Sequence, residues 1–72
     1  MEGNIAGVVQ LFGNRQAVVD GCDGVVDYSG EKILLRMGRL TVQLTGRDLR
    51  LKTLTATTAV VEGFLAGVEY VG

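Results

Sequence analysis

The side chains best suited to catalysis are scarce in this sequence. There is no histidine, and the thiol of the single cysteine, Cys22, therefore has no imidazole to activate it. Asp20, Asp23 and Asp27 surround a glycine-rich turn, but their spacing does not provide the alternating oxygen ligands and the closing glutamate of a calcium loop. We therefore interpret the aspartates as turn residues that cap the local backbone, and Cys22 as a surface or half-buried thiol.

Other arrangements that would support enzymatic chemistry are also missing. The sequence contains no G-x-x-x-x-G-K-[ST], no G-x-G-x-x-G and no G-x-S-x-G motif. Glu62 and Glu69 would need a cleft between them to act as a catalytic carboxylate pair, and a chain this short has little room for one. We predict a protein that is not an enzyme, with no cofactor, no metal site and no small-molecule substrate.

The charged residues are segregated along the chain. Residues 1–31 carry five acidic side chains against one arginine, and residues 32–52 carry six basic side chains against one aspartate. Residues 53–72 add two glutamates, which brings the net charge to −1. The candidate interaction surface that we select from the central basic block consists of Arg36, Arg39, Arg50 and Lys52.

This basic block has three interpretations. Its side chains can form the solvated face of a β-meander, paired across strands with acidic residues. A basic face on one copy can instead meet an acidic face on another copy, which would produce a homo-oligomer. Single-stranded nucleic acid is the third possible partner, but no aromatic residue lies among the arginines and the pI is about 5.1, so we expect no nucleic acid to bind.

Length and composition favour one small β domain. The 72 residues allow one domain, which we expect to span residues 1–72. Val, Ile and Thr account for 19 residues against 5 alanines, and these β-branched side chains suit a pleated sheet better than a helix. A chain of this size hides only a little over ~60% of its surface on folding, which makes self-association a reasonable expectation.

Alternating apolar residues predict an all-β fold of about seven short strands, arranged as a small antiparallel meander, sandwich or roll. The clearest strand is residues 39–45, in which Leu40, Val42 and Leu44 share one face. We also expect Ile33, Leu35 and Met37 to share one face of residues 32–37, and Leu49 and Leu51 one face of residues 49–54. The sequence after it predicts a turn at residues 46–48. The other expected strands are residues 5–12, 16–20, 25–28, 32–37, 49–54 and 60–70.

Two further patterns concern the architecture and the surface. Residues 38–42 and 46–51 share a glycine, an arginine and alternating apolar positions, which leaves a short β-solenoid-like stack as an alternative fold. In the terminal strand we expect Val60, Phe64, Ala66, Val68 and Tyr70 to share one face. Apolar residues that we expect opposite the main apolar set, and therefore against another chain, are Val18, Val25, Leu34, Leu54 and Leu65.

An ordered series of motifs between residues 13 and 70 resembles one known family. Leu11-Phe12-Gly13 precedes Gly24-Val25-Val26-Asp27-Tyr28-Ser29, and Lys32-Ile33-Leu34-Leu35-Arg36 follows. Leu40-Thr41-Val42 with Gly46 is similar to a family "L-x-I-x-G" motif, although Gly46 is displaced from the expected position. Residues 60–70 resemble the closing "I-x-G-x-I-x-x-I-x-Y". Together these features resemble the YabP/YqfC family of small sporulation proteins from endospore-forming bacteria, closest to the YqfC branch.

This resemblance implies a non-enzymatic structural or assembly protein required for endospore formation. The protein would act through self-association or by docking to a spore-envelope or membrane-associated sporulation protein, in the mother cell or at the developing spore envelope. A small single-stranded nucleic-acid-binding β domain is the alternative. The first residues lack the basic start of a secretory signal and there is one cysteine, so we expect a cytoplasmic, reducing location.

Overall fold

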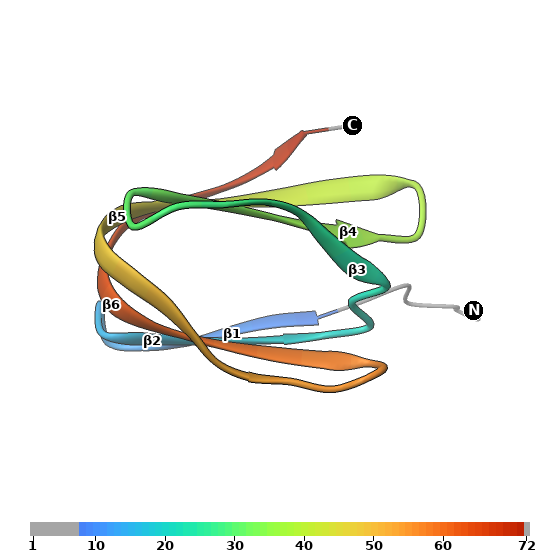
Figure 1. The fold of residues 1–72 in the computed structure, drawn as a ribbon, viewed down its shortest axis with the longest axis horizontal. Helices are drawn as coiled ribbons and strands as arrows, with labels where there is room; N and C mark the ends of the chain where they lie inside the picture. The colour runs from blue at the N-terminus through green and yellow to red at the C-terminus, as the bar shows by residue number, and fades with distance from the viewer. Residues whose placement is uncertain (1–7, 72) are drawn as a thin grey trace.

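The computed structural model describes residues 8–71, which form one antiparallel sheet of six strands without a helix (Figure 1). The strands are β1 (Val8–Phe12), β2 (Gln16–Asp20), β3 (Gly24–Tyr28), β4 (Lys32–Met37), β5 (Leu40–Leu54) and β6 (Thr58–Val71). Their order across the sheet is β1-β2-β6-β5-β4-β3. The prediction of an all-β antiparallel fold is confirmed; residues 5–7 of the first expected strand lie outside the described residues. No helix in the described part is long and apolar enough to cross a membrane.

The turn expected at residues 46–48 is wrong, and this accounts for six strands instead of seven. Residues 40–54 form one 15-residue strand, β5, which pairs along its length with the 14-residue β6. The pairing register shifts between Thr45 and Gly46 and again between Arg47 and Arg50. These bulges bend both long strands, so that the sheet curls and its two halves face each other (Figure 1). The two similar segments that suggested a solenoid are consecutive halves of this one strand.

Two glycines allow β5 and β6 to approach closely at the bend. A Cβ atom on Gly46 would lie 1.8 Å from the backbone oxygen of Phe64, and one on Gly63 would lie 2.4 Å from the backbone oxygen of Asp48. Gly63 also has a φ of 138°, and Asp48 has a φ of 54°, in the left-handed region. The bend therefore depends on the absence of side chains at residues 46 and 63.

The core lies between the two facing halves of the sheet. Its fully buried residues are Ala17, Val19, Cys22, Ile33, Leu35, Met37, Val42, Leu44, Leu49, Ala59 and Val61. The faces predicted for β4 and for both halves of β5 are confirmed. The thiol of Cys22 is not at the surface, because its Sγ is buried and lies 3.5 Å from the Gly24 carbonyl oxygen.

The expected apolar face of β6 is wrong for its first half. Ala59 and Val61 face the core there, instead of Val60. After the bend, Val68 packs against the core as expected, and Leu65, expected on the opposite face, does so as well. A shift of one residue exchanges the two faces of a strand, so a single bulge explains why one alternation rule does not describe the whole of β6.

The two halves of the sheet repeat one arrangement. The β1–β2 hairpin flanks the first half of β6, just as the β3–β4 hairpin flanks the first half of β5. The turn of each hairpin accepts two backbone hydrogen bonds from the long strand at its bend. These bonds are Gly63 N to Arg15 O at 3.0 Å, Leu65 N to Asn14 O at 2.7 Å, Gly46 N to Glu31 O at 3.0 Å, and Leu49 N to Gly30 O at 2.8 Å. An approximate two-fold axis between β5 and β6 thus relates the halves.

We expect the substitution Gly46→Ala to lower the free energy of unfolding by about 3 kcal/mol or more, the upper range for overpacking, because a rigid backbone oxygen occupies the space of the new methyl group. Urea denaturation followed by circular dichroism measures this change. The matched control is Gly30→Ala, where no heavy atom lies within 4 Å of the new Cβ, and its effect should stay within about 0.5 kcal/mol. Equal stability of the two variants would contradict the role assigned to the bend.

Candidate interaction surface

The structure divides the four selected basic residues into two pairs. Arg36 lies on β4 and Arg39 in the turn that follows it, whereas Arg50 and Lys52 lie on β5 beyond the bend. All four side chains are exposed. The Lys52 Nζ lies 3.3 Å from Glu62 Oε2, and Arg50 pairs with Glu62 in the strand register. Cross-strand pairing with an acidic residue, the first interpretation of the basic block, therefore describes Lys52.

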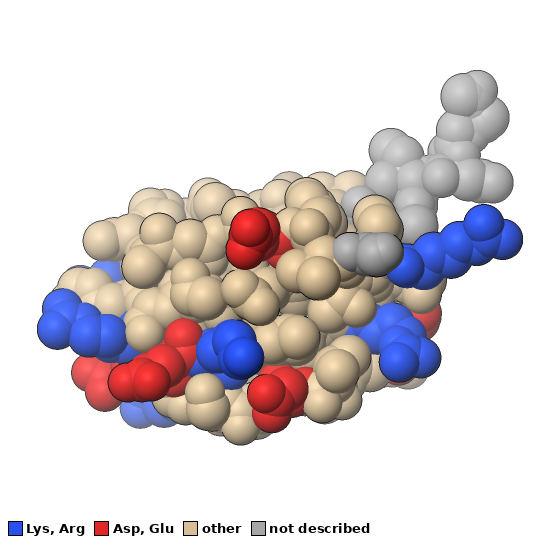
Figure 2. Space-filling view, turned by 90° about the horizontal axis from the view of Figure 1, so that it is seen from above, with Lys and Arg blue, Asp and Glu red and all other residues tan. Residues whose placement is uncertain are grey.

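The surface seen from above has no continuous basic area. In Figure 2 charged groups of both signs lie side by side along the lower margin and at the ends of the molecule, one acidic group stands alone in the middle of the face, and most of the remaining surface is uncharged. The prediction that the aspartates cap the local backbone holds only for Asp27, whose Oδ1 accepts a hydrogen bond from the neighbouring Tyr28 N at 2.9 Å. The other two aspartates bond to segments that are distant in the sequence. Asp23 Oδ2 accepts a hydrogen bond from Gly38 N at 2.8 Å, and Asp20 Oδ1 accepts one from the Thr58 hydroxyl at 2.8 Å.

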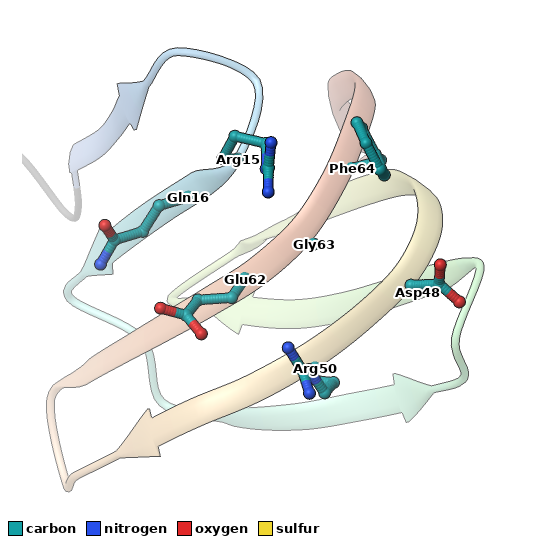
Figure 3. Close-up of a pocket in the computed structure, with 7 residues that line it drawn as sticks. All are labelled: Arg15, Gln16, Asp48, Arg50, Glu62, Gly63 and Phe64. Atoms are coloured by element: carbon teal, nitrogen blue, oxygen red, sulfur yellow. The ribbon is translucent and has the colours of Figure 1, made fainter.

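A second group of arginines, which sequence analysis did not select, surrounds Phe64 just after the bend of β6. The Arg15 guanidinium carbon lies 5.0 Å from the centre of the Phe64 ring, and that of Arg47 lies 5.7 Å from it. Beside the ring is a hollow of about 330 Å³, also lined by Arg50, Asp48 and Glu62 (Figure 3). The lining residues come from three separate segments, so no spacing rule in the sequence indicates them.

One side of the curled sheet is closed by the β3–β4 hairpin. The carbonyl oxygens of Glu31 and Gly30 accept hydrogen bonds from β5 at its bend, and further along the Tyr28 hydroxyl accepts one from Leu51 N at 3.1 Å. Edge strand β3 itself carries a bulge between Val25 and Asp27. Bulges and covering loops are devices that stop an edge from pairing with another chain.

The opposite side is open among the described residues. We call it the open edge, and it consists of β1 and of residues 66–71 of β6. β1 pairs only with β2, and this part of β6 pairs only with β5. The approximate symmetry places Leu11 where the closed side has Tyr28, since each pairs with a buried core residue of the adjacent strand. The same symmetry relates Leu51 of β5 to Val68 of β6. Because leucine has no hydroxyl, Leu11 cannot accept a hydrogen bond from Val68 N in the way that Tyr28 accepts one from Leu51 N.

The open edge lacks the usual protection against strand addition. The register of β1 with β2 is regular, and β1 contains no charged residue, no proline and no bulge. Its Leu11 is 52% exposed and Tyr70 of β6 is 55% exposed, although their strand partners Ala17 and Val42 are fully buried. The inner apolar surface of the curled sheet therefore continues outward at the open edge.

The residues that we expected to meet another chain are only partly exposed. Leu54 is 52% exposed, whereas Val18, Leu34 and Leu65 are half-buried. Val25 is exposed but lies on the core side of the sheet, because it pairs with buried Leu35. The predicted excess of exposed apolar surface is thus present, but part of it lies on other residues than those predicted. Alternation in the sequence does not show that the sheet curls, and it is this curling that leaves some inward-facing residues uncovered.

These features define a small, curled antiparallel β domain with one closed and one open edge. Residues 4–72 match the YabP family, and the chain belongs to this family. The match does not distinguish the YqfC branch, and family membership is consistent with a role related to sporulation. No curated protein and no solved structure was found to match the chain.

We expect the substitution Tyr28→Phe to lower the free energy of unfolding by about 1 kcal/mol, since it removes the acceptor for Leu51 N, and to accelerate hydrogen exchange of the Leu51 amide. Tyr70→Phe is the matched control, because the Tyr70 side chain is similarly exposed and its hydroxyl makes no hydrogen bond within residues 8–71. Exchange that is unchanged in Tyr28→Phe would contradict the assigned closure of this side.

Proposed function

We propose that this protein is a non-enzymatic assembly protein of endospore formation that acts by self-association, or by docking to a spore-envelope or membrane partner. The observation that carries the proposal is the open edge. A strand with unpaired backbone N–H and C=O groups recruits another strand unless charge, proline, a bulge or a covering loop prevents it.

The contrast between the two sides of the molecule supports this proposal. The β3 edge has a bulge and the Tyr28 hydroxyl bonds to the backbone of β5 at Leu51, whereas β1 has a regular register, an uncharged sequence and Leu11 in the place of Tyr28. A general lack of protection would leave both sides alike. The side chains of Leu11 and Tyr70 would lose contact with water when a second chain adds to the open edge. Because each is already about half buried, the further burial of Leu11 contributes roughly 1 kcal/mol, about half of the value for a fully exposed side chain.

The non-enzymatic part of the proposal is based on the available functional groups. The chain has no histidine, and the thiol of its one cysteine is buried in the core. Nucleophilic or general acid–base catalysis would thus depend on carboxylates, lysines, tyrosines and the hydroxyls of Ser29 and the six threonines, with no imidazole to activate them. The ordered carboxylates named above accept hydrogen bonds from Gly38 N and from the Thr58 hydroxyl or pair with Lys52, which are structural roles.

We expect Leu11→Lys to convert the self-associated protein to a monomer, because a lysine directed toward the core side of an edge strand opposes strand addition. Sedimentation velocity over a range of concentrations measures this conversion. The matched control is Leu54→Lys: Leu54 is also 52% exposed, but it lies on β5, separated from β1 by β2 and β6. Both variants should retain the circular dichroism spectrum of the wild type.

Three results would count against this proposal. A wild-type protein that is monomeric at high concentration and recovers no partner from sporulating cells would exclude assembly. Equal loss of association in both lysine variants would show that the open edge is not the contact. Binding to a fluorescent single-stranded oligonucleotide that weakens steeply with salt would favour the nucleic-acid alternative.

A further inference from the structure

The most organised polar feature outside the open edge is the group of arginines around Phe64. Phe64 is 43% exposed although it lies at the centre of the bend, and the guanidinium groups of Arg15 and Arg47 lie within cation–π distance of its ring. An aromatic ring satisfies the charge of a guanidinium but accepts few of its N–H groups as hydrogen bonds. These arginines therefore keep donors available while their position is restricted.

The backbone fixes the geometry of this group. Gly63 N donates to the Arg15 carbonyl oxygen at 3.0 Å, which holds the β1–β2 turn beside Phe64. Arg47 pairs with Phe64 in the register of the two long strands. Because the bend sets all three backbone positions, the guanidinium of Arg15 at the first hollow and that of Arg47 at the second are positioned before any ligand arrives. Such preorganisation reduces the entropic cost of binding.

Two hollows flank Phe64 and differ in chemistry. The first, of about 330 Å³, is lined by Arg15 and Arg50 together with Asp48 and Glu62 (Figure 3). Within residues 8–71 the carboxylate of Glu62 pairs with Lys52 at 3.3 Å, and no carboxylate lies within 4.0 Å of either arginine. The second hollow is lined by Phe64, Leu65 and Ala66 together with Thr45, Gly46, Arg47 and Glu31.

We infer that this bend is a binding site for an acidic residue of a partner protein. Its carboxylate would enter the first hollow between Arg15 and Arg50, and an apolar neighbour in the same extended segment would enter the second hollow against Phe64. A guanidinium binds a carboxylate with two parallel charge-assisted hydrogen bonds. This inference rests on the proposed docking role, since it specifies the chemistry of one contact with the partner.

The charges around the hollow favour a single carboxylate over a polyanion. Asp48 and Glu62 face the same hollow as the two arginines, and Glu31 lies in the second hollow. A phosphodiester chain would bring several negative charges past these acidic groups, and like charges in close proximity are repelled. The net charge of −1 gives no long-range attraction for nucleic acid either.

The test uses the full chain and two acetylated, amidated tripeptides, Leu-Glu-Leu and its neutral analogue Leu-Gln-Leu. Chemical shifts of the Gly63 and Phe64 amides and of the arginine Nε–H groups report binding at the bend. We expect the acidic peptide to bind roughly tenfold more tightly than the neutral one, because only the carboxylate forms charge-assisted hydrogen bonds. Arg15→Gln should reduce its affinity by a similar factor while preserving the fold, because the Arg15 backbone carbonyl remains.

The control substitution is Arg39→Gln, which removes an exposed arginine from the β4–β5 turn and should leave the affinity unchanged. Equal binding of the two peptides, no binding at all, or an equal loss in both arginine variants would overturn the inference. Tighter binding of a single-stranded oligonucleotide at the same resonances would also overturn it, in favour of a phosphate site. Sedimentation of the same samples separates the two proposals. A protein that is oligomeric but does not bind the acidic peptide refutes the carboxylate site and leaves the assembly proposal standing.

Discussion

The close approach of β5 and β6 at Gly46 and Gly63 determines the shape of this domain. At each glycine, a backbone oxygen of the opposite strand occupies the space in which any other residue would place its Cβ atom. Two long strands that approach this closely must bend together, and their bulges turn a flat six-stranded sheet into two facing halves. A core forms between these halves without a second sheet or a helix.

The bend also explains where the functional candidates lie. Each hairpin is attached to the long strand at the bend by two backbone hydrogen bonds, and this attachment brings Arg15 beside Phe64. The two sides are built alike but are closed differently, since the Tyr28 hydroxyl bonds to the backbone at Leu51 on one side and Leu11 takes its place on the other. Together with the bulge in β3, this difference in side chain leaves one edge of the sheet less protected than the other.

The small size of the domain connects this geometry with the proposed role. A sheet of these dimensions covers its centre but not its margins, so apolar side chains remain exposed on both edge strands and at the end of β6. Additional chain length would normally cover such margins. In a member of the YabP family that acts by assembly, a second polypeptide would supply this cover, and a carboxylate contact at the bend would add specificity to it.

The sequence by itself determined the fold class, the faces of β4 and β5 and the shortage of catalytic groups, because these follow from β-branched composition, strict alternation and residue types. It did not indicate that residues 40–54 form one bent strand, since a glycine marks a bulge and a turn equally well. It also did not place Arg15, Arg47 and Phe64 together. Only the tertiary structure decided these points, because they depend on contacts between segments that are distant in the chain and become neighbours when the sheet curls.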